Sequence, residues 1–326
     1  MRTVLVFLAV CGLALRIEAA PRPIESIKLD GVTYLRARAW ADANGLEPAW
    51  LVRDKTLQLA NVAAKIQLTV NSERIEFNGL TLALSQPVAA ANGAVYFSKL
   101  DADTVLAPLL SPPRISAGKK VKTICLDPGH GGRDPGFVVG SRQEKKYTLL
   151  LAQEVRDLLV KQGFKVVLTR KRDTFPELSD RAATASRAGA DLFVSLHFNA
   201  FIQDKSVNGA ETYCLTPAGA SSSNAGGVGA GTRAYRGNAN NEENINLAYQ
   251  LQKSLVRSAA SDDRGVKRAR FEVLREAAMP AALIETGFMS NTAEGKKIFD
   301  TKSRKAFARA IADGIVAYKK SVERGS

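Results

Sequence analysis

The spacing of apolar and polar residues divides the chain into two parts with different predicted architectures. Over residues 20–110, short alternating runs predict β-strands, and Asn78-Gly79 and Asn92-Gly93 mark turns between them. The expected strands are 56–59, 66–70 and 75–77, and the expected helices are 40–44 and 100–107. We therefore predict a small α+β module, followed at 111–121 by a linker rich in proline and in small or charged residues.

Residues 122–326 show another pattern, in which apolar runs of strand length alternate with helical periodicity. The expected strands are 123–126, 165–169, 192–196, 210–215 and 281–284, and the expected helices are 147–162, 180–188, 246–260 and 304–322. Repeated strand–helix units predict an α/β domain with a mostly parallel twisted sheet flanked by helices. The glycine- and serine-rich stretch from Thr216 to Glu243 predicts a long mobile loop on the chemical side of this fold.

The beginning of the chain has the composition of an export signal. Arg2 precedes an apolar run over 4–15 that is too short to span a bilayer, and Ala19 ends an acceptable cleavage site. We therefore expect a signal peptide over 1–19, no transmembrane helix in the mature chain, and a location in the periplasm or the extracellular space. Cleavage would leave Cys125 and Cys214 as the only thiols, and the sequence leaves open whether they are bridged or free.

Charge and composition narrow the class of partner. With 45% hydrophobic and 24% charged residues, the chain has the composition of a globular protein rather than of a disordered or membrane-embedded one. Its net charge is +14, of which residues 116–326 carry +12. Such a field favours polyanions, namely nucleic acid, anionic lipid or an acidic wall polymer, although a solvated cationic surface has the same signature. Export argues against nucleic acid as the partner.

The chain contains two histidines, His130 and His197, and each follows a predicted strand. Ligands gather at the carboxyl ends of strands in α/β sheets, and histidine is the commonest metal-binding side chain, although two unrelated loop histidines would give the same pattern. A catalytic zinc site usually takes three protein ligands and keeps one position for water. Glu144, which opens the next helix, is the third ligand that the spacing favours, with Asp134 and the two cysteines as competitors.

Glu285 directly follows the predicted strand 281–284, at the same edge of the sheet as both histidines. A hydrolytic metal site needs a base that takes the proton of the attacking water, and burial would raise the pKa of Glu285 toward neutrality. The alternative is a strand-end glutamate that pairs with an arginine such as Arg181 or Arg275.

Several separated motifs together resemble the zinc-dependent N-acetylmuramoyl-L-alanine amidases of the amidase type 3 family. The resemblance covers about residues 122–318, which is most of the second part of the chain. Its motifs are 126–132 (LDPGHGG), 144–145 (EK), 178–181 (LSDR), 190–200 (ADLFVSLHFNA), 264–267 (RGVK), 271–275 (FEVLR) and 279–291 (MPAALIETGFMSN).

This resemblance implies a function and a role for each candidate residue. His130, Glu144 and His197 would hold one Zn²⁺ ion, and Glu285 would be the catalytic glutamate. The substrate would be peptidoglycan, cut at the amide bond between N-acetylmuramic acid and L-alanine by a zinc-activated water, and the protein would be associated with the cell wall. Asn199 and Arg275 are candidates for contacts to the sugar or the peptide.

Two other readings stay open, a non-catalytic wall-binding protein on the same scaffold and a zinc peptidase that acts within the stem peptide. Residues 25–110 more weakly resemble the N-terminal module of copper amine oxidases and of some exported wall enzymes, which implies a wall-targeting or spacer role without copper. Some family members cover their zinc with a displaceable helix. The 216–243 stretch is a poor helix former, so we do not expect Glu242 or Glu243 to act as such a plug.

Overall fold

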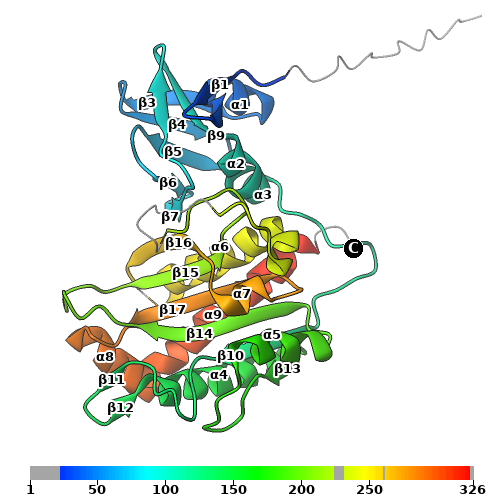
Figure 1. Cartoon of the computed structure of the whole chain (residues 1–326), viewed down its shortest axis with the longest axis vertical. Coiled ribbons are helices and arrows are strands. Elements are labelled where there is room, and N and C mark those ends of the chain that lie inside the picture. Colours follow the sequence, from blue (N-terminus) through cyan, green and yellow to red (C-terminus); the bar gives the residue numbers. More distant parts are fainter. Residues whose placement is uncertain (1–22, 224–230, 260, 324–326) are drawn as a thin grey trace, which may run out of the picture.

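The computed structural model describes residues 23–223, 231–259 and 261–323, so the predicted signal peptide lies outside the described residues. Figure 1 shows the N-terminal module adjoining a larger layered domain. Among the described helices, none combines the length and the hydrophobicity that a membrane span requires.

Within the described residues, one sheet of eleven strands passes through both parts of the chain, in the order β13-β10-β14-β17-β15-β16-β7-β6-β5-β4-β3. The C-terminal domain contributes β10 (Thr123–Pro128), β13 (Lys165–Leu168), β14 (Leu192–Asn199), β15 (Ala210–Leu215), β16 (Asp263–Ala269) and β17 (Ala281–Phe288). β13, β10, β14 and β17 run parallel, which confirms the predicted α/β fold with a mostly parallel sheet.

Helices cover both faces of this part of the sheet. One layer consists of α4 (Glu144–Lys161), α6 (Asn241–Ser258), α8 (Thr292–Phe299) and α9 (Thr301–Val322), and α9 packs against each of the others. The opposite face carries α5 (Leu178–Arg187) and the short α7 (Glu272–Arg275), which pack against each other. A small hairpin of β11 (Val138–Val139) and β12 (Arg142–Gln143) precedes α4.

The direction of β15 corrects one prediction. β15 pairs antiparallel with β17, and Glu211 lies opposite Glu285. Thr216 therefore leaves the sheet at the end opposite to Glu285, so the predicted loop on the chemical side does not begin there. Its described residues also include a 3₁₀-helix, Arg236–Asn240, and the first turn of α6, which begins at Asn241 rather than at 246.

The N-terminal module consists of short strands, one short helix and one interrupted helix. Its strands are β1 (Ser26–Leu29), β2 (Val32–Arg36), β3 (Glu47–Val52), β4 (Thr56–Ala60), β5 (Lys65–Thr69), β6 (Arg74–Phe77), β7 (Leu80–Ala83), β8 (Ala89–Ala91) and β9 (Ala94–Ser98). Its helices are α1 (Ala37–Ala43), then α2 (Lys99–Asp101), a π-helical turn (Ala102–Leu106) and α3 (Ala107–Leu110) in succession. The three predicted strands and both predicted helices are present, with small shifts at their ends.

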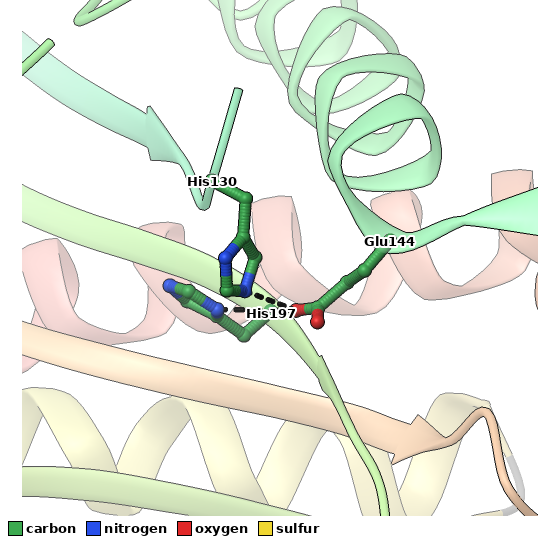
Figure 2. Close-up of side chains that lie close together, drawn as sticks. All are labelled: His130, Glu144 and His197. Atoms are coloured by element: carbon green, nitrogen blue, oxygen red, sulfur yellow. Dashed lines mark hydrogen bonds and ion pairs between the residues drawn. The ribbon is translucent and has the colours of Figure 1, made fainter. Parts of the chain in front are cut away.

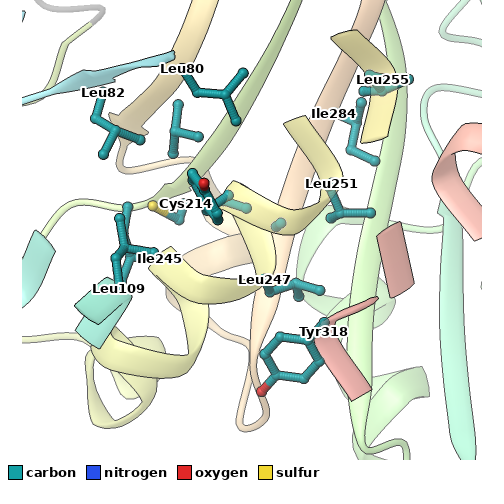
Figure 3. Packing of buried hydrophobic residues seen from close by; sticks show 14 of the residues in the cluster. Leu80, Leu82, Leu109, Cys214, Ile245, Leu247, Leu251, Leu255, Ile284 and Tyr318 are labelled. Atoms are coloured by element: carbon teal, nitrogen blue, oxygen red, sulfur yellow. The ribbon is translucent and has the colours of Figure 1, made fainter. Parts of the chain in front are cut away.

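The module joins the C-terminal domain through the sheet as well as through the 111–121 segment. β7 pairs with β16, where Leu82 lies opposite Val266, and the Thr81 N–H donates to Asp263 Oδ2 at 2.7 Å. Figure 3 shows Leu80, Leu82 and Leu109 close to Cys214 and Ile245, so one apolar core crosses the junction. The N-terminal module is thus packed against the domain, not tethered by a linker alone.

The two cysteines settle a question that the sequence left open. Cys125 in β10 and Cys214 in β15 are both buried and free, so they do not form a bridge. Burial raises the pKa of the Cys125 thiol to about 12, and the charge of Asp127 adds to the effect. These thiols pack in the core as small apolar groups.

Candidate metal centre and active site

Side chains from three separate segments meet at the carboxyl ends of β10 and β14. His130 follows β10, Glu144 is the first residue of α4, and His197 lies near the end of β14 (Figure 2). Glu144 Oε1 lies 3.1 Å from His130 Nε2 and 3.2 Å from His197 Nδ1. One potential ligand atom from each residue lies within 4.8 Å of the other two, so this His–Glu–His group could hold a metal ion.

The donor set suits a divalent transition ion. Two imidazole nitrogens and one carboxylate oxygen are ligands that zinc accepts, and three protein ligands leave a position for water. Burial alone would lower the pKa of His130, but the carboxylates of Glu144 and Asp134 outweigh it and raise that pKa. Burial alone would raise the pKa of Glu144, but hydrogen bonds from both imidazoles outweigh it and hold that pKa below the usual range. The Glu144 carboxylate is therefore held in its ionised form, which is the form that binds a cation.

Asp134, whose spacing from His130 made it a competing candidate for the third ligand, does not belong to the His–Glu–His group. Its Oδ2 lies 2.7 Å from His130 Nδ1, on the far side of the ring from Glu144. Because an ionised carboxylate can only accept, Nδ1 donates its proton to Asp134, and Nε2 faces Glu144, where a bound ion would take the place of the Nε2 proton. Such an outer carboxylate fixes the tautomer and orientation of a metal-binding histidine. The structure thus places Asp134 behind the His130 ring, on the side away from Glu144.

Backbone N–H groups fix the carboxylate of Glu144. Oε1 accepts from Phe198 N at 3.1 Å, and Oε2 accepts from Phe137 N at 3.0 Å. The side chain is 5% exposed, so these contacts replace the water that a charged carboxylate would otherwise need. Glu144 therefore stands in one orientation before any ion binds.

Glycines in the loop after β10 allow the rings and the carboxylate to approach the backbone. A Cβ at Gly129 would lie 2.2 Å from Cε1 of His197, and a Cβ at Gly136 would lie 2.6 Å from Glu144 Oε2. Gly136 also has a φ of +63°, and His130 itself has a φ of 60° in the left-handed region. The Arg181 guanidinium donates to the His130 carbonyl at 3.0 Å, which helps to hold this unfavourable conformation.

We predict that Gly129→Ala disrupts the metal group without unfolding the domain. The new methyl group would occupy the space of the His197 ring, so the ring must move away from Glu144. A misplaced ligand loses metal affinity by about 10- to 100-fold, as is found when ligand-orienting groups are removed. Zinc titration of the purified variant measures the effect. Gly140→Ala, at an exposed turn whose Cβ position meets nothing within 4 Å, is the control for adding a methyl group in this region; its φ of +59° adds backbone strain that Gly129 does not have, so it is a stringent control for folding.

Glu285 lies in the same row of the sheet as His197. The two residues are paired across β14 and β17, so their side chains leave the same face. Glu285 Oε2 is buried and has no hydrogen-bond partner among the described residues. Burial, with the charges of Glu144 and Glu211, raises the pKa of Glu285 well above the ordinary range, and Lys267 opposes this shift. A buried carboxylate in this environment is a candidate for proton exchange.

The arginines that could have paired with Glu285 are engaged elsewhere. Arg181 forms a buried ion pair with Asp127 at 2.8 Å, and Asp127 also accepts from Ser195 Oγ at 2.8 Å. Asp127 thus anchors the end of β10 and the loop that follows it. Arg275 lies 3.8 Å from Glu272 and stacks over Tyr235, and it does not line the cavity at the metal group.

A network around Glu211 was missed by reasoning from the sequence. Glu211 is 2% exposed and lies opposite Glu285 on β15. Its carboxylate accepts from Asn199 Nδ2 at 2.6 Å and from Tyr213 OH at 2.8 Å, and it pairs with Arg264 and Lys267. Asn199 lines the cavity, but Glu211 and the Ala200 N–H already hold both ends of its amide. The sequence did contain a signal for this network, because Glu211 is an ionisable residue within an apolar strand.

We predict that Glu211→Gln lowers the free energy of unfolding by about 3 kcal/mol, the cost of removing one partner from a buried ion pair. The loss stays at the low end because Arg264 and Lys267 keep some contact with solvent. Urea denaturation of the variant and of Glu76→Gln, an exposed glutamate of β6, measures the difference. Equal stability of the two variants would show that the ion pairs around Glu211 contribute little.

One cavity contains the whole site. It has a volume of ≈ 360 Å³, and its lining includes the three residues of the His–Glu–His group together with Asn199 and Glu285. The loop after β10 and the ends of β14 and β17 also contribute to its wall, and α5 and the start of α7 close it on one face of the sheet. No described residue of the 216–243 stretch lines it, so Glu242 and Glu243 do not cover the group.

Comparison with known proteins gives a consistent result. The profile of the family described as N-acetylmuramoyl-L-alanine amidase matches residues 124–317. The chain is 36% identical over 197 residues to the N-acetylmuramoyl-L-alanine amidase LytC of Bacillus subtilis, a match that covers 60% of this chain and 35% of LytC. It is 31% identical over 226 residues to the N-acetylmuramoyl-L-alanine amidase AmiA of Escherichia coli, covering 62% of this chain and 77% of AmiA.

A solved structure agrees with these sequence matches. The crystal structure of an N-acetylmuramoyl-L-alanine amidase from Clostridium difficile 630 matches with a TM-score of 0.52 and 33% identity, over 61% of this chain and 97% of that one. The shared part is thus about the size of the C-terminal domain. The chain spans about a third of LytC, so much of that relative has no counterpart in this match.

Proposed function

Because the chain belongs to the N-acetylmuramoyl-L-alanine amidase family, we propose that it hydrolyses the amide bond between N-acetylmuramic acid and L-alanine in peptidoglycan. The observation that carries this proposal is the meeting of His130, Glu144 and His197 with Glu285 in one cavity. A protein that only binds the wall has no use for an unpaired buried carboxylate beside a metal group.

The cofactor in this proposal is one Zn²⁺ ion held by His130, Glu144 and His197. The residues fit such an ion, since two imidazoles point at one carboxylate oxygen and Asp134 fixes the tautomer of one of them. When bound, the ion would supply Lewis-acid chemistry, which polarises the scissile carbonyl and makes water more acidic.

The chain's own residues supply the proton transfers. Glu285 takes a proton from the attacking water, whose oxygen forms the new bond to the carbonyl carbon of the lactyl group. As the carbon–nitrogen bond breaks, Glu285 returns the proton to the nitrogen of L-alanine, so the products are a muramyl carboxylic acid and a free peptide. Burial and the neighbouring carboxylates raise the pKa of Glu285, which favours the protonated form that it needs in order to return the proton.

The proposed location is the cell wall outside the cytoplasmic membrane. The match to N-acetylmuramoyl-L-alanine amidases supports it, because the proposed substrate lies in the wall, and the +12 charge of residues 116–326 suits contact with an anionic wall polymer. Fractionation of cells expressing the full chain tests the location, and co-sedimentation with purified walls tests the contact.

Digestion of purified muropeptides tests the activity. The mature protein should release peptides that begin with L-alanine and glycan that keeps its lactyl group, as identified by mass. A chelator should stop the reaction, and added zinc should restore it. Cleavage between amino acids would identify a peptidase instead, and binding to walls without any cleavage would identify a wall-binding protein.

A further inference from the structure

A second cavity adjoins the metal site and differs from it in charge. It has a volume of ≈ 350 Å³, and its walls come from the β11–β12 hairpin, the loop after β14 and the segment from β17 into α8. Phe137 lines both cavities, and its N–H donates to Glu144 Oε2 at 3.0 Å. Glu144, a residue of the metal group, therefore fixes the backbone of Phe137 at the boundary between the two cavities.

Much of the surface of this second cavity is apolar and open to solvent. Val138, Val139 and Ile202 are 44%, 36% and 68% exposed. Phe299 of α8 lies behind them and packs against Tyr147 of α4, with ring centroids 4.7 Å apart. Exposed apolar side chains that gather around a hollow beside an active site indicate a ligand surface rather than chance exposure.

The charged side chains of this cavity are all cationic within the described residues. Arg142, Lys205 and Lys296 line it, and no carboxylate does. None of the three forms an ion pair in the described part of the chain, and the Arg142 guanidinium stacks over the Phe299 ring at 4.3 Å. The neighbouring Glu294 is buried, and its carboxylate accepts the N–H groups of Gly209 and Phe288 instead. Three cations thus remain available to an anionic ligand.

We propose that this second cavity binds the stem peptide of the substrate and recognises its carboxylates, an inference that rests on the proposed amidase function. Around the bond to be cut, the sugar units are neutral, because the lactyl carboxyl is in amide linkage. The negative charges belong to the stem peptide, which also presents apolar alanine side chains. Cations around an apolar hollow match that half of the substrate, and the metal group in the adjoining cavity then lies next to the bound peptide, at the junction of sugar and peptide.

Kinetics on two soluble muramyl peptides of equal length tests this assignment, one with free side-chain and terminal carboxylates and one with those groups amidated. In the triple variant Arg142→Ala, Lys205→Ala, Lys296→Ala, we expect KM for the acidic substrate to rise about tenfold, the effect that three solvent-exposed charge contacts supply. kcat should be unchanged, and KM for the amidated substrate should not move. Lys297→Ala, an exposed lysine of α8 that lines a different hollow, is the matched control.

The outcomes separate the subsite from the activity. A KM that rises equally for both substrates, or for neither, would overturn the peptide subsite while the amidase function stands. If the unaltered protein cleaves neither substrate, the amidase function itself fails. A salt-dependent KM for the acidic substrate, lost in the triple variant, would support the charge contacts independently of the substitutions' effect on shape.

Discussion

Glu285→Gln is expected to lower kcat by about a thousandfold, within the range that a positioned proton-transfer group contributes. Glutamine keeps the shape of the side chain but cannot accept the proton of the attacking water. The His–Glu–His group does not include Glu285, so the zinc content should stay at that of the unaltered protein. Steady-state turnover of a muramyl peptide, measured together with metal analysis of the same preparation, checks both parts.

The same substitution should not destabilise the protein. Burial and the charges of Glu144 and Glu211 disfavour the ionised form of Glu285, which is why its pKa is raised. A neutral glutamine removes this unfavourable charge, so the free energy of unfolding near pH 7 should be unchanged or higher. A side chain that costs stability and supports turnover is the pattern expected of a catalytic residue. Near-normal turnover in Glu285→Gln would refute the assignment, and the exposed Glu276→Gln of the same region controls for loss of one negative charge.

The main parts of the fold could be predicted because each depends on local pattern. Runs of apolar residues identified β10, β14 and β17, and helical periodicity identified α4 and α9. β16 was missed because its seven residues include Asp263, Arg264, Lys267 and Arg268, so it does not show an apolar run. In the structure, charged residues of β16 form ion pairs with a neighbouring strand, since Arg264 and Lys267 pair with Glu211 of β15.

The direction of β15 could not be predicted from local pattern. An apolar strand reads the same whether it joins its neighbour parallel or antiparallel, and the strand–helix alternation favoured parallel pairing. The antiparallel pairing with β17 brings Glu211 beside Glu285 and carries Thr216 to the far end of the sheet. The antiparallel direction of β15 therefore explains two errors of the sequence analysis: Glu211 was missed, and the loop that begins at Thr216 was placed on the wrong side of the sheet.

The site residues were more predictable than the contacts that support them. His130 follows a strand, His197 and Glu285 lie near the carboxyl ends of strands, and Glu144 opens a helix, so their convergence follows from the rule that such ends meet at one edge. The supporting contacts depend on exact packing, such as the N–H of Phe198 on Glu144. Spacing could name Asp134 as a neighbour of His130, but only coordinates separate a ligand from the group behind it.

His197→Ala is expected to remove both the bound zinc and the activity. Two protein ligands would remain, and catalytic zinc sites usually need three. His197 is a better choice than Glu144 for this test, because Glu144 also binds the N–H groups of Phe137 and Phe198 and its loss would disturb the surrounding loop. Metal analysis after dialysis should give one zinc per unaltered chain and close to none in the variant.

Thermal unfolding with added zinc distinguishes loss of the site from loss of the fold. An ion that binds only the folded state at a hundredfold excess over its Kd adds about 2.7 kcal/mol of stability, so zinc should raise the Tm of the unaltered protein. His197→Ala should fold without zinc and show no such rise. Asp134→Asn should keep the rise at higher zinc concentrations, because loss of an outer partner weakens affinity by about 10- to 100-fold without removing a ligand. If His197→Ala keeps a full zinc complement, the ion is not held by this group and the amidase mechanism must be rebuilt around other residues.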